Sequence, residues 1–126
     1  MQPAKSVSRF NIIIEIVGKG STTAELVRHL APLTSNAILK ALPLRDRIHK
    51  YSDKFAYIET KLVLGAEKQK TQFRRGELAF LPLNGSICLF LQDATVQPMN
   101  PLGAIIENVG LFESSHPGDI MLVKNS

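Results

Sequence analysis

The sequence predicts a mostly β domain, a closed antiparallel barrel of about eight strands with one short helix packed at the barrel end. Three observations support this fold class. Two nearly unbroken apolar runs, residues 78–81 and 87–91, flank an Asn-Gly pair that is typical of hairpin turns. Both faces of each run are apolar, so the sheet must be covered on both sides. Apolar residues recur at helical spacing in residues 32–41, directly after a proline, whereas apolar and polar residues alternate in several other segments.

The first third of the chain predicts a hairpin followed by this helix. β-branched residues are frequent in residues 9–17, which we expect to form a strand before a glycine-flanked turn. The next segment is ambiguous, because Thr22 and Glu25 have the spacing of a capping box that would start a helix. Pro32 favours a return strand instead, since proline is a good first residue of a helix and a poor interior one. We therefore expect a strand at residues 22–29 and the helix at residues 32–41.

The remaining strands alternate less regularly. In addition to the central hairpin, we expect them at residues 44–51, 55–64, 103–109 and 120–123. Residues 65–76 are polar and basic, which indicates a mobile connection or a ragged edge. Residues 92–100 contain Pro98 and are expected to form a loop.

Length and composition indicate one domain. The 126 residues suit a single domain at residues 1–126, with residues 1–8 expected to be flexible. Hydrophobic residues make up 44% and charged residues 21%, which excludes wholesale disorder. The apolar runs are far shorter than the ~20 residues of a membrane helix, so no membrane partner is expected. Cys88 is the only cysteine, so no intrachain disulfide can form, in agreement with the cytoplasmic location that we expect.

Positive charge is concentrated in the middle of the chain. The segment from Lys40 to Arg75 has ten basic and four acidic residues, a net charge of +6, against +4 for the whole chain. One interpretation is a nucleic-acid-binding surface in which aromatic residues of this segment stack on bases. The other is a set of solvated strand faces whose charges discourage edge-to-edge pairing. We favour the second, because the basic residues are dispersed among acidic ones. The aromatic residues concerned are Tyr51, Phe55, Tyr57 and Phe73.

The order of several short motifs resembles the cyclophilin fold. Glu25-Leu26 and the later Ala31-Pro32-Leu33-Thr34 are similar to that family's acidic-leucine strand and helix start. Further matching positions are Ile48-His49-Lys50 with Phe55 on its Phe-His-Arg motif and later phenylalanine, and Asn84-Gly85-Ser86 on its Asn-Gly-Ser-Gln-Phe-Phe stretch. A closer likeness is to small uncharacterised prokaryotic domains with a cyclophilin-like barrel, at the positions Gly76-Glu77, Pro82, Gly85, Cys88 and Phe90. The resemblance covers most of the chain.

The resemblance implies prolyl cis/trans isomerase chemistry at a site whose polar groups have changed. Lys50 stands where the family has an arginine, and lysine lacks the planar fork that hydrogen-bonds the substrate amide. Ile58 replaces a glutamine of the family. We therefore expect a degenerate site without efficient isomerase activity, which binds a small apolar ligand or peptide beside the central hairpin. The expected groove residues are Lys50, Phe55, Ile58, Leu81, Pro82, Ile87 and Leu89. A weak isomerase is the alternative.

Other catalytic patterns are weaker. Cys88 lies within an apolar strand without an adjacent base, which indicates core packing and not a nucleophile. His29, His49 and His116 are scattered without metal-ligand spacing. We therefore expect no metal and no cofactor. The sequence leaves open a homodimer formed through an exposed apolar strand edge.

Overall fold

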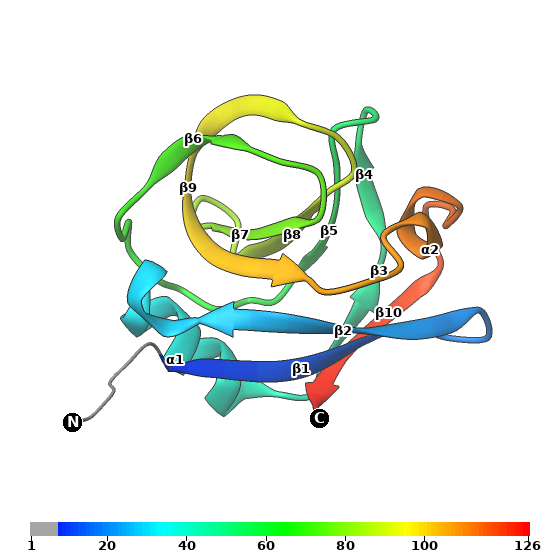
Figure 1. Ribbon diagram of the computed structural model, residues 1–126, viewed down its shortest axis with the longest axis horizontal. Coiled ribbons are helices and arrows are strands. Elements are labelled where there is room, and N and C mark those ends of the chain that lie inside the picture. The colour runs from blue at the N-terminus through cyan, green and yellow to red at the C-terminus, as the bar shows by residue number, and fades with distance from the viewer. Residues whose placement is uncertain (1–7) are drawn as a thin grey trace.

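The computed structural model describes residues 8–126, which form ten strands, two α-helices and one 3-10 helix (Figure 1). The strands are β1 (Arg9–Ile16), β2 (Gly20–Val27), β3 (Leu44–Arg47), β4 (His49–Tyr51), β5 (Phe55–Glu59), β6 (Lys70–Phe73), β7 (Glu77–Leu81), β8 (Ser86–Phe90), β9 (Ala94–Ile105) and β10 (Ile120–Asn125). The helices are η1 (Arg28–Leu30), α1 (Pro32–Ala41) and α2 (Gly110–Glu113). The lead-in expected at residues 1–8 lies, except for Ser8, outside the described residues. No helix within residues 8–126 is long and apolar enough to span a membrane.

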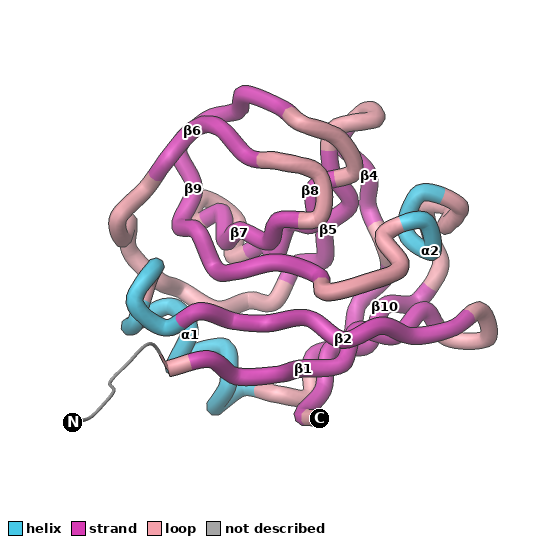
Figure 2. The backbone as a smooth tube through the Cα atoms, in the orientation of Figure 1, coloured by secondary structure: helices cyan, strands magenta, loops and turns pink. Residues whose placement is uncertain are grey.

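The strands pair in an antiparallel arrangement with the order β3-β10-β1-β2-β9-β7-β8-β5-β4, and β6 pairs with β9 outside this path. The sheet curls strongly, and β6 lies beside the first half of β9 over the β7–β8 hairpin (Figure 2). The predicted closed barrel of eight strands is wrong in two respects. The sheet has ten strands and stays open, with β3 and β4 at its two ends.

The sheet stays open because one segment changes its partner. Residues 44–51, expected as a single strand, divide at Ile48, so that β3 pairs with β10 whereas β4 pairs with β5. Ile48 is buried, and its N–H donates to the Asp119 carbonyl at 2.7 Å. Between β3 and β5, the Glu59 N–H donates to Asp46 Oδ2 at 2.9 Å. At this place a side-chain oxygen accepts the hydrogen bond that a backbone carbonyl of a neighbouring strand would otherwise accept. We call the gap between β3 and β5, where the two ends of the sheet meet, the seam.

Two apolar cores lie on opposite faces of the β7–β8 hairpin. Successive side chains of a strand point to opposite faces, and the hairpin residues alternate between the cores accordingly. The first core receives Leu78, Phe80, Ile87 and Leu89, and the second receives Ala79, Leu81, Cys88 and Phe90. Strands β1, β2 and β10 and helix α1 also contribute to the first core, whereas β6 and β9 cover the second. This burial confirms the two-sided covering that the apolar runs predicted.

The hairpin turn has the position that the Asn-Gly pair between the two apolar runs predicts. Leu81 pairs with Ser86, so residues 82–85 form a four-residue connection. Gly85 has a φ of 67°, and a Cβ there would lie 2.6 Å from the Leu62 carbonyl oxygen. Glycine is therefore required both by the left-handed backbone conformation and by the close approach of the chain near Leu62.

Strand β9 overturns the expected loop at residues 92–100. It begins at Ala94 and includes both Pro98 and Pro101. Proline donates no ladder hydrogen bond and is tolerated in strands at edges and bulges. Here the register of β9 shifts against β6 and again against β7, which accommodates both rings.

Three other element boundaries differ from the sequence-based expectation. Residues 65–76, expected as a mobile connection, contain β6, which pairs only with β9 among the described strands. Strand β5 ends at Glu59 instead of residue 64, and the following chain leaves the sheet through Lys61, which has a φ of 68°. The strand expected at residues 103–109 ends at Ile105 and is followed by α2.

Helix α1 has the predicted bounds, and its N-terminus is capped by a distant glutamate. The Glu67 carboxylate accepts hydrogen bonds from the Leu33 N–H at 2.9 Å, the Thr34 N–H at 2.8 Å and Thr34 Oγ1 at 2.7 Å. The buried side chain of Asn100 holds Glu67 and Thr34 in place. Asn100 Oδ1 accepts a hydrogen bond from the Glu67 N–H, and Asn100 Nδ2 donates one to Thr34 Oγ1. Burial alone would raise the pKa of Glu67, but the hydrogen bonds from Leu33 and Thr34 outweigh it and lower the pKa.

We expect this cap to make stability depend on pH. The folded-state pKa of Glu67 lies below its ordinary value of 4.5, so the carboxylate stabilises the fold fully above that pH, and the contribution disappears as the pH falls through the lowered pKa. Glu67→Gln should cost about 1 kcal/mol at neutral pH. It should also lose less stability on acidification than the wild type, as measured by urea unfolding across the acidic range. Exposed Glu107→Gln is the control, and identical pH profiles for wild type and Glu67→Gln would contradict this account.

Candidate ligand-binding groove

The groove residues expected from the sequence are divided between the two faces of the sheet. Ile58, Ile87 and Leu89 belong to the first core, whereas Phe55 and Leu81 belong to the second. Pro82 is half-buried in the hairpin turn. Because the hairpin separates the two cores, these side chains do not line a common groove.

The space inside the first core is too small for a ligand. It is lined by ten apolar residues, including Ile87 and Leu89, and its volume is about 10 Å³. One water molecule needs about 10–15 Å³ of such space. A small apolar ligand at this position would have to displace core side chains.

Lys50, at the arginine-like position, is engaged in structural hydrogen bonds. It lies on β4, and its Nζ donates to the Ser115 carbonyl at 2.6 Å and to the Glu113 carbonyl at 3.3 Å. These bonds attach the end of α2 to β4. Lys50 borders an open hollow of about 260 Å³ together with Asp53, Leu91, Gln92 and Glu113. Its ammonium group is therefore used for α2 and does not project freely toward a substrate amide.

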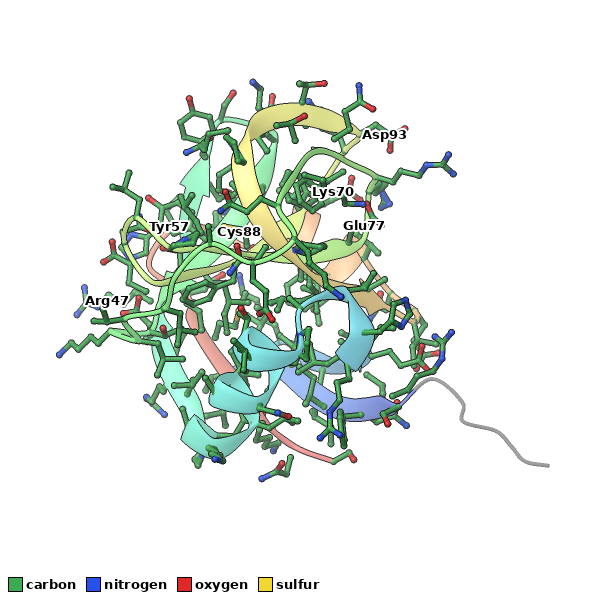
Figure 3. All side chains as sticks on the ribbon, turned by 90° about the vertical axis from the view of Figure 1, so that its left-hand side faces the viewer. Arg47, Tyr57, Lys70, Glu77, Cys88 and Asp93 are labelled. Atoms are coloured by element: carbon green, nitrogen blue, oxygen red, sulfur yellow. The ribbon has the colours of Figure 1, made fainter. Side chains whose placement is uncertain are left out.

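An open cavity that is larger than the hollow beside Lys50 lies against β6. It has a volume of about 460 Å³ and is formed by β6, the turn after it and the start of β9. Its lining residues are Lys70, Gln72, Phe73, Arg74, Glu77, Asp93, Ala94 and Thr95. Figure 3 shows Lys70, Glu77 and Asp93 gathered on one side of the molecule, away from Arg47 and Tyr57. We call this cavity the β6 groove.

The β6 groove carries charges of both signs. Glu77 Oε1 accepts from the Arg74 N–H at 2.7 Å and lies 3.5 Å from Lys70 Nζ. Asp93 Oδ1 accepts from the Arg75 N–H at 2.9 Å. Within residues 8–126, the guanidinium group of Arg74 has neither an ion-pair nor a hydrogen-bond partner. The groove thus offers carboxylates held in place by backbone N–H groups, and a cation that is available to a ligand.

Aromatic stacking makes the floor of the β6 groove rigid. The Phe73 ring is only 3% exposed and stacks on Phe90, with centroids 4.7 Å apart and an interplanar angle of 9°. Phe90 in turn contacts Phe55, with centroids 5.3 Å apart. Lys70 Nζ lies 4.8 Å from the Phe73 centroid, which places a cation on the ring. The second core therefore supports the groove from below.

Sequence reasoning missed this groove because its residues fall in two segments expected to be irregular. The sequence predicts a connection at residues 65–76 and a loop at residues 92–100, yet the two segments pair as β6 and β9. The available signal was Phe73, a single large apolar residue in a polar segment. Such a residue is expected to be buried, and its burial orders the chain on both sides of it.

Cys88 has the position that its apolar strand predicted. It is fully buried in the second core, and this burial raises the pKa of its thiol. The thiol therefore stays protonated at neutral pH, and Cys88 acts as a small core residue.

Comparisons with known proteins agree with this architecture. The structure resembles the hypothetical protein AF2241 from Archaeoglobus fulgidus, with a TM-score of 0.79 and 20% identity over 98% of this chain and 100% of that one. It also resembles McbB, described in complex with tryptophan, with a TM-score of 0.77 and 16% identity over 91% of this chain and 44% of McbB. At these identities the likeness establishes the fold alone. No curated protein matches the sequence.

The family assignment comes from the sequence itself. The model of the cyclophilin-like family matches residues 9–124, which include all ten strands and both α-helices except for the last residue of β10. This protein therefore belongs to the cyclophilin-like family.

Proposed function

We propose that this protein is a non-catalytic binding domain that holds a short peptide, or a small molecule of similar chemistry, in the β6 groove. The observation that carries the proposal is the combination of opposite charges above an aromatic floor in a single cavity. Its volume of about 460 Å³ is within the usual range of ligand sites, roughly 300–1,000 Å³. The interior of the sheet lacks comparable space.

The charges in the groove favour a zwitterionic ligand. Arg74 can form a bidentate pair with a carboxylate, because its guanidinium group is planar and unpaired among the described residues. Glu77 and Asp93 can accept hydrogen bonds from an ammonium group. An amino acid, or a peptide end with a nearby side-chain charge, provides both signs.

The backbone next to the groove favours an extended peptide. Strand β6 pairs with β9 only, so among the described residues its other edge has no partner strand. A free strand edge presents N–H and C=O groups to which a peptide can add as a further strand. The neighbour McbB is described in complex with tryptophan, itself a zwitterion with an aromatic group, which supports amino-acid-like ligands as candidates.

Arg74→Ala tests the proposed site. With L-tryptophan and a pool of unmodified tripeptides as probes, we expect amide chemical-shift changes in ¹⁵N-labelled protein at residues 70–77 and 93–95. Arg74→Ala should weaken this binding at least tenfold, because a charge-assisted bidentate contact is lost. Exposed Arg45→Ala, on β3, should bind as the wild type does. No saturable shift with any probe, or equal affinity of Arg74→Ala and wild type, would contradict the proposal.

The same account proposes that isomerase activity is absent. Because the Lys50 ammonium group is held by the Ser115 and Glu113 carbonyls, it is not positioned to donate to a substrate amide. In a standard assay with a proline-containing peptide, we expect the uncatalysed rate for both wild type and Lys50→Ala. A rate well above background that Lys50→Ala abolishes would instead establish a weak isomerase.

Nucleic-acid binding receives less support from the placement of its expected aromatic residues. Phe55 and Phe73 are each only 3% exposed and pack in the second core. Tyr57 stacks on His49, so only Tyr51 presents much of its ring to solvent. Base stacking needs exposed rings along a positive groove. We therefore rank peptide binding above it.

A further inference from the structure

Three potential metal ligands, none of which lines the β6 groove, meet at the open seam of the sheet between β3 and β5. Asp46 lies on β3, His49 begins β4 and Glu59 ends β5. One ligand atom from each lies within 4.8 Å of the other two. We propose that these side chains bind a divalent first-row transition ion of the Zn²⁺ type, with water completing the coordination.

The distance between two of the ligands already suits coordination. His49 Nε2 lies 3.5 Å from Asp46 Oδ2. Two ligands bound tetrahedrally at about 2.1 Å from a zinc ion are roughly 3.4 Å apart. The third ligand, Glu59, is exposed, so its side chain can rotate to close the remaining distance. Binding therefore needs a small side-chain movement and no change of backbone.

Neighbouring groups orient two of the ligands before any ion binds. The Glu59 N–H donates to Asp46 Oδ2 at 2.9 Å, which fixes the carboxylate and leaves lone pairs on both of its oxygens. The His49 ring stacks on Tyr57, with centroids 5.1 Å apart and an interplanar angle of 26°. Such outer contacts are what hold metal ligands in a productive orientation.

The donor set indicates the class of ion. An imidazole nitrogen with two carboxylates suits zinc and its neighbours, whereas magnesium and calcium prefer oxygen ligands alone. A bound ion would connect β3 to both β4 and β5 at the seam, where Asp46 already accepts a hydrogen bond from the Glu59 N–H. It would therefore stabilise the fold as well as occupy the site.

Sequence reasoning missed this cluster because its members are on three different strands. The expectation of no metal rested on the scattered histidines, and His29 and His116 indeed take no part in the cluster. The cluster arises because the chain changes partner at Ile48, which brings Asp46 and His49 to one corner although they belong to different strands.

The alternative is a contact between His49 and Asp46 that holds no metal. Titration of untagged protein with Co²⁺ and Zn²⁺ distinguishes the two. We expect one Co²⁺ per chain with visible absorption bands, displacement by Zn²⁺, and a Tm that rises with Zn²⁺. His49→Ala and Glu59→Gln should each weaken binding at least tenfold, and His29→Ala, an exposed histidine outside the cluster, should not.

Two results would overturn the proposal. One is the absence of saturable binding near one equivalent. The other is binding that His49→Ala and Glu59→Gln leave unchanged, which would place the ion elsewhere. Both variants alter partly or fully exposed side chains. Glu59→Gln also keeps the backbone N–H that donates a hydrogen bond to Asp46. Circular dichroism should therefore show that both variants are folded.

Discussion

The burial of both faces of the β7–β8 hairpin is the constraint on which the rest of the structure depends. Its alternating side chains supply two separate cores, so neither face can be exposed to water without loss of apolar contacts. The curled sheet and α1 cover one face. The other needs a second cover, which β6 and the first half of β9 provide, with Phe73 stacked on Phe90. The outer layer is therefore a structural requirement of the hairpin.

This requirement also determines where binding sites can form. The first core is filled, with space for at most about one water molecule. The second core is covered by the first half of β9 and by β6, whose outer edge has no partner strand among the described residues. The β6 groove is lined by charged residues from three places: Arg74 just after β6, Glu77 at the start of β7, and Asp93 just before β9.

Patterns that act locally predicted much of the fold, and those that depend on distant partners did not. The bounds of α1 follow from Pro32 and from the apolar spacing after it, and the hairpin follows from its continuous apolar runs. The division at Ile48 was not predictable, because residues 44–51 contain no glycine or proline to mark a break and the two parts differ in their partner strands. The expected groove residues do not share one face of the sheet, and the reason is their spacing along the strand. Phe55 and Ile58 are three positions apart on one strand, and an odd spacing places side chains on opposite faces. Lys70, Arg74 and Asp93 lie in polar segments that carry no local signal of pairing, so the β6 groove emerges only from the tertiary structure.

Hydrogen exchange of the backbone amides tests the central role of the hairpin most directly. If both cores depend on it, the amides of residues 78–81 and 87–90 should exchange only through global unfolding and should be the slowest of the described chain. Strands β1 and β2, buried on one face, should exchange faster. Hairpin amides that exchange faster than those of β1 and β2 would contradict the account, because the two cores would then be held together by another part of the sheet.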